Sequence, residues 1–284
     1  MVNIPEKSSS LRVLMLGDIV GRPGRKALEE GVRGARQRLS ADLVVVNGEN
    51  AAGGTGIDPG TAHEIQKSGV DIITLGDHAF QRKGSKDLLA AHAAWCIRPF
   101  NFPSASTPGK GWTSWRRSDG VVVVVANLIG RVFISGTAEC PFRGLDSILE
   151  ETKDLKASVY ICDFHAEATS EKWAMARHSD GRISLLTGTH THVQTADAQI
   201  LPGGTGYITD LGMSGSTSGV IGMDSKVALR RFTSPMPAPY EIAEGEGALS
   251  GVIADIDIAS GRCVWIEAFR GCGTEIRIGG RVQV

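Results

Sequence analysis

The sequence predicts an α/β fold in which two α/β halves pack sheet against sheet within one domain. Short runs of Val, Ile and Leu alternate with segments of helical spacing, and most of these runs end in a polar turn that contains Gly. The length of 284 residues suffices for one large or two small domains. Because no repeat, low-complexity tract or linker divides the chain, we expect a flexible tail over 1–10 and a single domain over 11–284.

The segment up to residue 95 repeats a strand–loop–helix unit. Apolar runs predict strands at 11–17, 42–47 and 71–75, and helical spacing follows at 24–39, from Pro59 onward and at 85–94. Proline is favoured at the first position of a helix, so Pro59 indicates where the second helix begins. Strands that alternate with helices in this way are typical of a parallel sheet that is covered on both faces.

The rest of the chain is less regular. Residues 101–111 are rich in Pro, Gly and Ser and predict a long loop. Segments 249–259 and 262–269 predict two antiparallel strands that are joined at 260–261. Further apolar runs predict strands at 121–129, 157–163, 183–188 and 207–210.

Composition excludes several classes of protein. The formal net charge of −1 gives no bulk attraction toward nucleic acid or anionic membranes. The five cysteines are scattered, without a C-x-x-C pair, which argues against a disulfide framework and a structural zinc site. The N-terminal residues lack the apolar core of a signal peptide, and no run reaches the roughly 18 apolar residues of a membrane helix. We therefore expect a cytoplasmic protein without a membrane partner, and a homo-oligomer is left open.

Side chains with metal-ligand chemistry follow the predicted strands. Ligand sites in open α/β sheets collect where strands end, and the Gly residues beside these side chains allow sharp turns and close approach of an ion or phosphate. Each motif alone has a structural explanation, such as a turn or helix cap for Asp18. Together they predict a metal site. The residues are Asp18, Glu49, Asn50, Asp77, His78, His165, His190 and His192.

These residue types suit a pair of metal ions that clamps a phosphate ester. Carboxylates, a carboxamide and imidazoles without thiolates favour Mn²⁺, Fe²⁺/Fe³⁺ or Zn²⁺. His190 and His192 stand two residues apart, so an extended chain would place both on one side, where they could serve adjacent ions. His63, His92 and His178 lie in helical stretches outside this pattern, and we expect them on the surface or satisfied in the core.

Six runs of the sequence resemble the calcineurin-like metallophosphoesterases, and among them the bacterial YmdB-like family. The resemblance covers nearly the whole chain, and a run as long as DFHAEATSEK (163–172) is highly specific. The runs are LGDIVGRPGR (16–25), VNGENAAGGTG (46–56), RPFNFP (98–103), DFHAEATSEK (163–172), GTHTHVQTAD (188–197) and ITDLGM (208–213).

The resemblance implies a four-layer α/β/β/α sandwich with two metal ions at the sheet edge between its halves. Mn or Fe is the expected metal, and Zn is the next choice. It also implies the activity, which is hydrolysis of phosphodiesters, notably 2′,3′-cyclic nucleotides, by a metal-bridging hydroxide. His78 would protonate the leaving oxygen or stabilise the phosphoryl oxygens. By the same resemblance, Asp18, Glu49, Asn50 and His192 hold the first ion, and Glu49, Asp77, His165 and His190 hold the second.

The sequence departs from the motifs it resembles at two positions. Val20 stands where most of the superfamily has a metal-binding His, and Asn50 looks like its substitute. Asp77 stands where the family has Asn, which adds a negative charge and removes an amide donor. Two alternatives stay open: a phosphomonoesterase that uses the same centre, and a metal-bound regulatory module that senses a nucleotide and turns over slowly.

Overall fold

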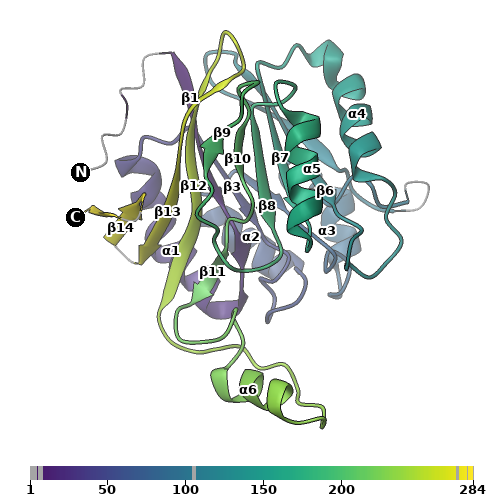
Figure 1. Ribbon diagram of the computed structural model, residues 1–284, viewed down its shortest axis with the longest axis vertical. Coiled ribbons are helices and arrows are strands. Elements are labelled where there is room, and N and C mark those ends of the chain that lie inside the picture. The colour runs from purple at the N-terminus through teal and green to yellow at the C-terminus, as the bar shows by residue number, and fades with distance from the viewer. Residues whose placement is uncertain (1–4, 6–8, 104–106, 273–274, 280, 284) are drawn as a thin grey trace.

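The computed structural model describes residues 5, 9–103, 107–272, 275–279 and 281–283, and it places helices outside two β-sheets that pack face to face (Figure 1). Three buried apolar clusters lie between the layers: one between the sheets and one under the helices of each sheet. The predicted four-layer α/β/β/α sandwich is therefore confirmed. The division into a tail and a single domain stays a prediction, since most of 1–10 lies outside the described residues.

The first sheet combines a parallel core with an antiparallel side. β1 lies between β3, which is parallel to it, and β12, which is antiparallel. The sheet order is β15-β14-β13-β12-β1-β3-β4, and β11 pairs with both β2 and β12. The strands are β1 (Ser10–Leu16), β2 (Asp18–Ile19), β3 (Leu43–Asn47), β4 (Ile72–Thr74), β11 (Met213–Ser216), β12 (Gly247–Asp257), β13 (Cys263–Cys272), β14 (Glu275–Ile278) and β15 (Arg281–Gln283).

The second sheet has the same plan. Its central strands β6, β7, β8 and β10 are parallel, and the edge strands β5 and β9 pair antiparallel with them. The order is β5-β6-β7-β8-β10-β9. The strands are β5 (Trp112–Arg116), β6 (Val122–Ile129), β7 (Val159–His165), β8 (Leu185–Thr189), β9 (Gln199–Ile200) and β10 (Gly206–Ile208).

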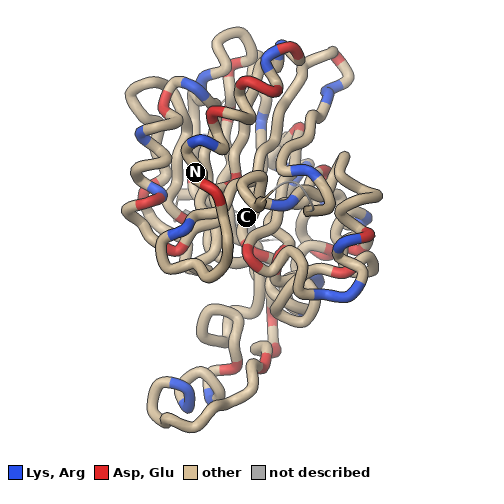
Figure 2. Tube along the Cα trace, turned by 90° about the vertical axis from the view of Figure 1, so that its right-hand side faces the viewer, with Lys and Arg blue, Asp and Glu red and all other residues tan. Residues whose placement is uncertain are grey.

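Helices cover the outer face of each sheet. Residues of α1, α2 and α3 share the outer cluster of the first sheet, and residues of α4 and α5 share that of the second. Helix α6 projects from the body on a segment between β11 and β12, as Figures 1 and 2 show. The helices are α1 (Gly21–Arg38), α2 (Pro59–Lys67), α3 (Ser85–Ala91), α4 (Pro141–Thr152), the 3-10 helix η2 (Lys153–Leu155), α5 (Thr169–Ser179) and α6 (Ser225–Thr233).

The alternation of apolar residues along β1 explains how one strand serves two cores. Leu11, Val13 and Met15 belong to the cluster between the sheets. Leu14 and Leu16 belong to the cluster under the helices. Because successive side chains of a strand point to opposite faces, a continuous apolar run is what a strand buried on both sides requires. Each such side chain stabilises the fold by about 1.5–3 kcal/mol when fully buried.

Most predicted elements are present, with shifted bounds. Helix α2 begins at Pro59 as predicted, and β12 and β13 form the predicted antiparallel pair. Helix α1 begins three residues before the predicted start, and β7 extends to include His165. Helices α4, α5 and α6 were not predicted. Of the predicted loop 101–111, residues 104–106 lie outside the described residues.

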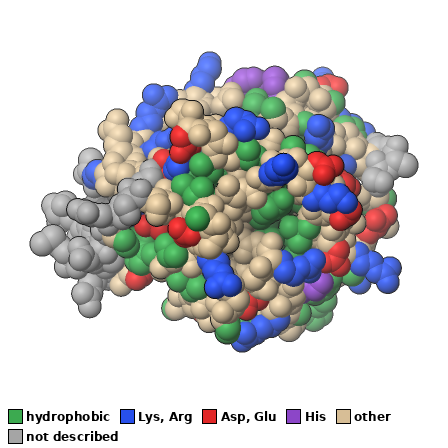
Figure 3. Space-filling view, turned by 90° about the horizontal axis from the view of Figure 1, so that it is seen from above, with side chains coloured by type: hydrophobic (Ala, Val, Ile, Leu, Met, Phe, Trp, Pro, Cys, Tyr) green, Lys and Arg blue, Asp and Glu red, His purple; other side chains and the backbone are tan. Residues whose placement is uncertain are grey.

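Surface properties agree with the composition. Basic and acidic side chains are interspersed over the face seen in Figure 3, and no extended basic surface appears there. Within the described residues, no helix is both long enough and apolar enough to span a bilayer. The cytoplasmic location and the oligomeric state stay predictions.

Candidate metal centre

The carboxyl ends of strands from both sheets meet at one edge of the sandwich. From the first sheet, Asp18 lies in β2, Glu49 and Asn50 follow β3, and Asp77 follows β4. From the second sheet, His165 ends β7. A hydrogen bond from Asn47 Nδ2 on β3 to Asp163 Oδ2 on β7, at 3.0 Å, ties the two sheets together just behind these residues.

Four of the predicted ligands form one compact group. Glu49, Asp77, His165 and His190 each offer a ligand atom, and these atoms all lie within 4.8 Å of one another. His165 Nε2 is the middle of the group: it lies 3.0 Å from Glu49 Oε1, 3.1 Å from Asp77 Oδ1 and 3.0 Å from His190 Nδ1. The set that was predicted for the second ion is therefore brought together.

Gly76 is required for this close approach. A Cβ atom at position 76 would lie 2.2 Å from Glu49 Oε2 and 2.3 Å from His165 Nε2. Any larger residue would push apart two members of the group. The Gly that precedes Asp77 in the sequence is thus part of the construction of the site.

Hydrogen bonds behind the group fix the tautomer of His165. Thr189 Oγ1 donates to Asp163 Oδ1 at 2.7 Å, so it must accept the bond from His165 Nδ1 at 2.9 Å. Nδ1 therefore carries a proton, and Nε2 of the neutral ring directs a lone pair at two carboxylates. Metal-binding histidines are oriented by this kind of hydrogen bond on their other nitrogen.

A cation at Nε2 would resolve the repulsion between this lone pair and the carboxylate oxygens. A proton can take its place: burial alone would lower the pKa of His165, but Glu49 and Asp77 raise it well above its ordinary value. Burial likewise opposes ionisation of Asp77, yet the hydrogen bond and charge of His165 hold the pKa of Asp77 below its usual range. The donor set fits a divalent metal ion, which would compete with that proton.

Asp18, Asn50 and His192 form a looser group beside the first. Asn50 Nδ2 lies 3.1 Å from His192 Nε2 and 3.3 Å from Glu49 Oε1, while His192 Nε2 lies 3.9 Å from Asp18 Oδ1. Asp18 Oδ1 is buried without a hydrogen-bond partner. An unpartnered buried carboxylate oxygen is unfavourable unless a cation or proton satisfies it, so this group also fits a cation.

The two histidines of the G-T-H-T-H segment do not lie in an extended strand. β8 ends at Thr189, and both His190 and His192 have positive φ angles, 102° and 66°. The chain is not extended there, so the condition under which both would lie on one side is not met. Even so, each meets the group that was predicted for it: His190 approaches His165, and His192 approaches Asn50.

His78 lies at the rim of the centre. Its side chain is 30% exposed, and Nδ1 lies 3.3 Å from Asp77 Oδ2. The amide nitrogen of Gln81 lies 2.8 Å from the same ring nitrogen. The backbone N–H of His78 donates to Glu49 Oε2 at 3.1 Å, which ties the rim to the centre. His78 is thus placed to reach a bound molecule, as a proton donor must be.

Four residues of the centre were not predicted. Asp163 and Thr189 hold His165, as described above. Glu167 Oε2 lies 3.2 Å from His190 Nε2, and Gln81 contacts His78. Asp163 was visible as a carboxylate at the end of a predicted strand, but its role depends on the pairing of β7 with β8.

The histidines that were expected outside the site do lie outside it. His63 contacts the carbonyl oxygen of Pro59 and the ring of Trp95. His178 pairs with Asp146 on the surface at 3.0 Å. Val20 is buried, and its side chain packs near Gly222. Because this side chain is aliphatic, it supplies no ligand.

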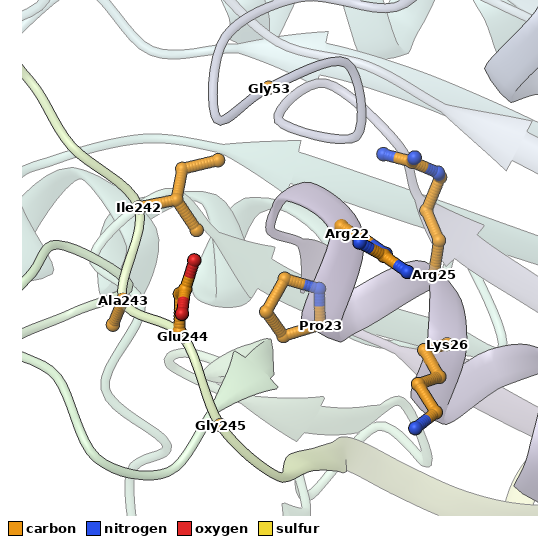
Figure 4. Close-up of a pocket in the computed structure, with 9 residues that line it drawn as sticks. All are labelled: Arg22, Pro23, Arg25, Lys26, Gly53, Ile242, Ala243, Glu244 and Gly245. Atoms are coloured by element: carbon orange, nitrogen blue, oxygen red, sulfur yellow. The ribbon is translucent and has the colours of Figure 1, made fainter.

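A hollow of about 480 Å³ lies beside the loop after Asn50, but none of the candidate ligands lines it (Figure 4). Its basic side chains come from the start of α1. Arg25 is engaged by Ala51 O and Glu64, and Lys26 lies 3.6 Å from Glu30. Since none of the candidate ligands lines the hollow, we assign it no part in the metal centre. Its lining is Arg22, Pro23, Arg25, Lys26, Gly53, Ile242, Ala243, Glu244 and Gly245.

The buried carboxyl of Asp18 predicts a pH-dependent stability for protein treated with a chelator. Burial raises the pKa of Asp18 from 3.8 to about 6. Because the folded state holds this proton more tightly than the unfolded state, the free energy of unfolding should fall as pH rises from about 4 to about 6, by up to about 3 kcal/mol. Denaturant titrations across this range, with Asp18→Asn as control, measure the effect. Parallel profiles for the two proteins would contradict it.

Known proteins resemble this chain in sequence and in fold. The family described as YmdB-like protein matches residues 14–269. A Bacillus subtilis protein named 2′,3′-cyclic-nucleotide 2′-phosphodiesterase is 42% identical over 90% of this chain and 96% of its own length. A hypothetical protein from Thermus thermophilus has a solved structure with a TM-score of 0.86 and 38% identity, which covers 93% of this chain and all of that one. The structure of a novel phosphatase from Mycoplasma pneumoniae has a TM-score of 0.84 and 30% identity, over 94% of this chain and 95% of that one.

Proposed function

The chain belongs to the YmdB-like protein family, and on that premise we propose that it is a metal-dependent phosphodiesterase that hydrolyses 2′,3′-cyclic nucleotides. One observation carries the proposal: His165 Nε2 faces Glu49, Asp77 and His190 at 3.0–3.1 Å, with its other nitrogen already used as a donor. This is a ligand set for a hard or borderline cation. The 42% identity to a named cyclic-nucleotide phosphodiesterase supports the substrate class.

We assign the ligands to two ions that share Glu49. Asp18, Asn50 and His192 would complete the first site, and Asp77, His165 and His190 the second. The amide nitrogen of Asn50 faces Glu49 and His192 in this structure, so Asn50 would have to turn its carbonyl oxygen inward to stand in for the imidazole that Val20 replaces. Carboxylate, amide and imidazole donors favour Mn²⁺ or Fe²⁺/Fe³⁺, with Zn²⁺ as the third choice.

Bound divalent ions would supply positive charge for the phosphoryl oxygens and lower the pKa of water toward about 7. The remaining work falls to residues of the chain. Water attacks phosphorus, the P–O2′ ester bond breaks, and the leaving O2′ must gain a proton. His78, partly exposed at the rim and held by contacts with Asp77 and Gln81, is the residue we assign to donate that proton. The product is a nucleoside 3′-phosphate.

Side-by-side assays test this function. With Mn²⁺ present, we expect hydrolysis of a 2′,3′-cyclic nucleotide to exceed hydrolysis of a nucleoside monophosphate. The reverse order would favour the phosphomonoesterase alternative. Tight nucleotide binding without turnover, in protein saturated with Mn²⁺, would favour the sensing module instead.

The sensing alternative rests on Asp77. Its Oδ1 lies 3.1 Å from His165 Nε2 and its Oδ2 lies 3.3 Å from His78 Nδ1, so its charge acts on a ligand and on the proposed proton donor together. With Asp18 and Glu49, it gives the centre three carboxylates. A more anionic centre attracts an anionic phosphodiester less and polarises bound water less.

Asp77→Asn is therefore expected to raise kcat/KM for phosphodiesters about tenfold or more and to shift the rising limb of the pH–rate profile to lower pH. The reason is the removal of one negative charge a few Å from the reacting phosphate. The measurement compares wild type and variant with Mn²⁺ and with iron. If the variant is slower with each metal, Asp77 is a tuned ligand, fitted for example to Fe³⁺, and the charge argument fails.

A further inference from the structure

Two of the runs quoted above each contain a charged residue that the metal centre does not use. Lys172 ends DFHAEATSEK, and Asp210 lies inside ITDLGM. The fold joins them: Lys172 Nζ donates to Asp210 Oδ2 at 2.6 Å, and each side chain is 1% exposed. A buried ion pair loses the hydration of both ions and is often no better for stability than apolar residues. Its presence here calls for another explanation.

Asp210 also binds the turn that carries His190 and His192. Its Oδ2, the atom that meets Lys172, accepts from the backbone N–H of Thr191 at 3.1 Å. Its Oδ1 accepts from Gly212 N at 2.8 Å. Thr191 is the residue between the two histidines, so the ion pair is fixed to the midpoint of the turn.

The turn needs such support because its backbone is unfavourable. His190 and His192 both have left-handed φ angles, 102° and 66°. Conformations of this kind are unfavourable for residues other than Gly and persist where the surroundings impose them. Besides the bond from Thr191 to Asp210, His190 N donates to Asp18 Oδ2 at 3.1 Å. Two carboxylates thus hold consecutive backbone N–H groups of the turn.

The stem of Lys172 contacts the strand that leads into the turn. A Cβ atom at Gly188 in β8 would lie 3.0 Å from Lys172 Cδ and 1.8 Å from Thr209 O. The backbone of Leu211 donates to Gly188 O at 2.8 Å. Lys172, on α5, therefore reaches the turn along a strand end that leaves no room for a side chain.

We propose that the Lys172–Asp210 ion pair is a positioning device: it holds the histidine turn in its left-handed form and so sets the metal affinity of both ligand groups. The inference rests on the proposed function only in that the turn carries metal ligands. Lys172 and Asp210 act through the backbone of Thr191 and are not assigned to the metal or the substrate.

The test compares this ion pair with a second buried pair away from the centre. Arg12 on β1 and Asp255 on β12 lie 2.6 Å apart, with side chains 3% and 2% exposed, so Arg12→Met is a matched control for Lys172→Met. Breaking either pair leaves a buried charge without a partner and should destabilise chelator-treated protein. Mn²⁺ affinity, measured by titration calorimetry, should fall about 10–100-fold for Lys172→Met and Asp210→Asn and stay unchanged for Arg12→Met.

A double variant covers the case in which Lys172→Met does not fold. Lys172→Met with Asp210→Leu replaces the pair by apolar side chains, a change that is often neutral for stability. It leaves Thr191 N–H without its acceptor, so we expect the same 10–100-fold loss of Mn²⁺ affinity. Wild-type affinity in this variant would overturn the proposal, as would an equal loss in Arg12→Met. Failure of the double variant to fold would assign the pair to fold stability and also overturn it.

These outcomes are separate from those of the proposed function. If wild-type protein binds Mn²⁺ but hydrolyses no cyclic nucleotide, the proposed function is contradicted. The inference about the ion pair is then still decided by the Mn²⁺ affinities of the variants. Wild-type protein that hydrolyses the nucleotide while all three single variants keep its Mn²⁺ affinity supports the function and overturns the inference.

Discussion

Replacing Glu49 with alanine is expected to prevent either metal ion from binding stably. The Glu49 side chain is 1% exposed, and its Oε1 lies 3.0 Å from His165 Nε2 and 3.3 Å from Asn50 Nδ2. It therefore contacts both ligand groups. Loss of a shared ligand leaves both coordination shells incomplete, so elemental analysis should find fewer than one ion per chain, against about two in wild type. Hydrolysis of the cyclic nucleotide should fall below detection with the metal.

Glu171→Ala is the matched control for Glu49→Ala. Glu171 is also a buried glutamate whose carboxylate accepts backbone N–H groups, here those of Arg131 and Val132. Removing it should destabilise the fold but leave the metal content of folded protein unchanged. Two ions per chain in Glu49→Ala would contradict the shared-ligand assignment, and metal loss in both variants would show a general effect of removing a buried carboxylate.

His78→Ala is expected to lower turnover of a 2′,3′-cyclic nucleotide by about 10²–10⁴-fold while metal content stays near normal. The alkoxide that leaves a ribose ring needs a proton, and the partly exposed imidazole of His78 at the rim is the group assigned to supply it. A nitrophenolate leaves without protonation, so the loss should be much smaller for a nitrophenyl phosphodiester. The two kcat values, measured on the same preparation, give the comparison.

His178→Ala controls for the loss of an exposed histidine. Both imidazoles are 30% exposed and both pair with an aspartate, His78 with Asp77 and His178 with Asp146. His178→Ala should keep wild-type turnover on both substrates. If His78→Ala protein is instead depleted of metal, His78 is a ligand and the proton-donor assignment is wrong. Equal losses on both substrates would also contradict it.

The fold and the location of the site could be predicted because both follow from local patterns. Apolar runs buried on both sides marked the central strands, and polar residues beside Gly marked their carboxyl ends. Parallel strands place their carboxyl ends at one edge, so residues that follow neighbouring strands, such as Glu49 after β3 and Asp77 after β4, meet without further information. Pro59 marked a helix start for an equally local reason.

Helix α5 was missed because its buried face is partly charged. Glu171 and Lys172 are both buried, and their partners are the 131–132 backbone and Asp210. Charged residues at buried positions remove the apolar periodicity on which helix prediction depends. Glu171 and Lys172 gain their partners only when the second sheet is assembled, since each partner lies at the end of a different strand or loop.

The chemistry of His165 could not be predicted either. Its tautomer depends on Thr189 and Asp163, which meet through the pairing of β7 with β8. The left-handed residues His190 and His192 are held by bonds to Asp18 and Asp210 that no local pattern contains. Residue types predicted which side chains come together at this edge, whereas their orientation and support follow from the tertiary structure.

Under the proposed function, metal held by these residues supports phosphodiester hydrolysis. Elemental analysis and a 2′,3′-cyclic-nucleotide assay on one purified sample, before and after chelation, test it most directly. We expect about two ions of Mn or Fe per chain, loss of activity together with the metal, and recovery of both when Mn²⁺ is restored. Protein that contains no bound metal, yet hydrolyses the cyclic nucleotide at a rate that chelation does not change, would contradict the claim.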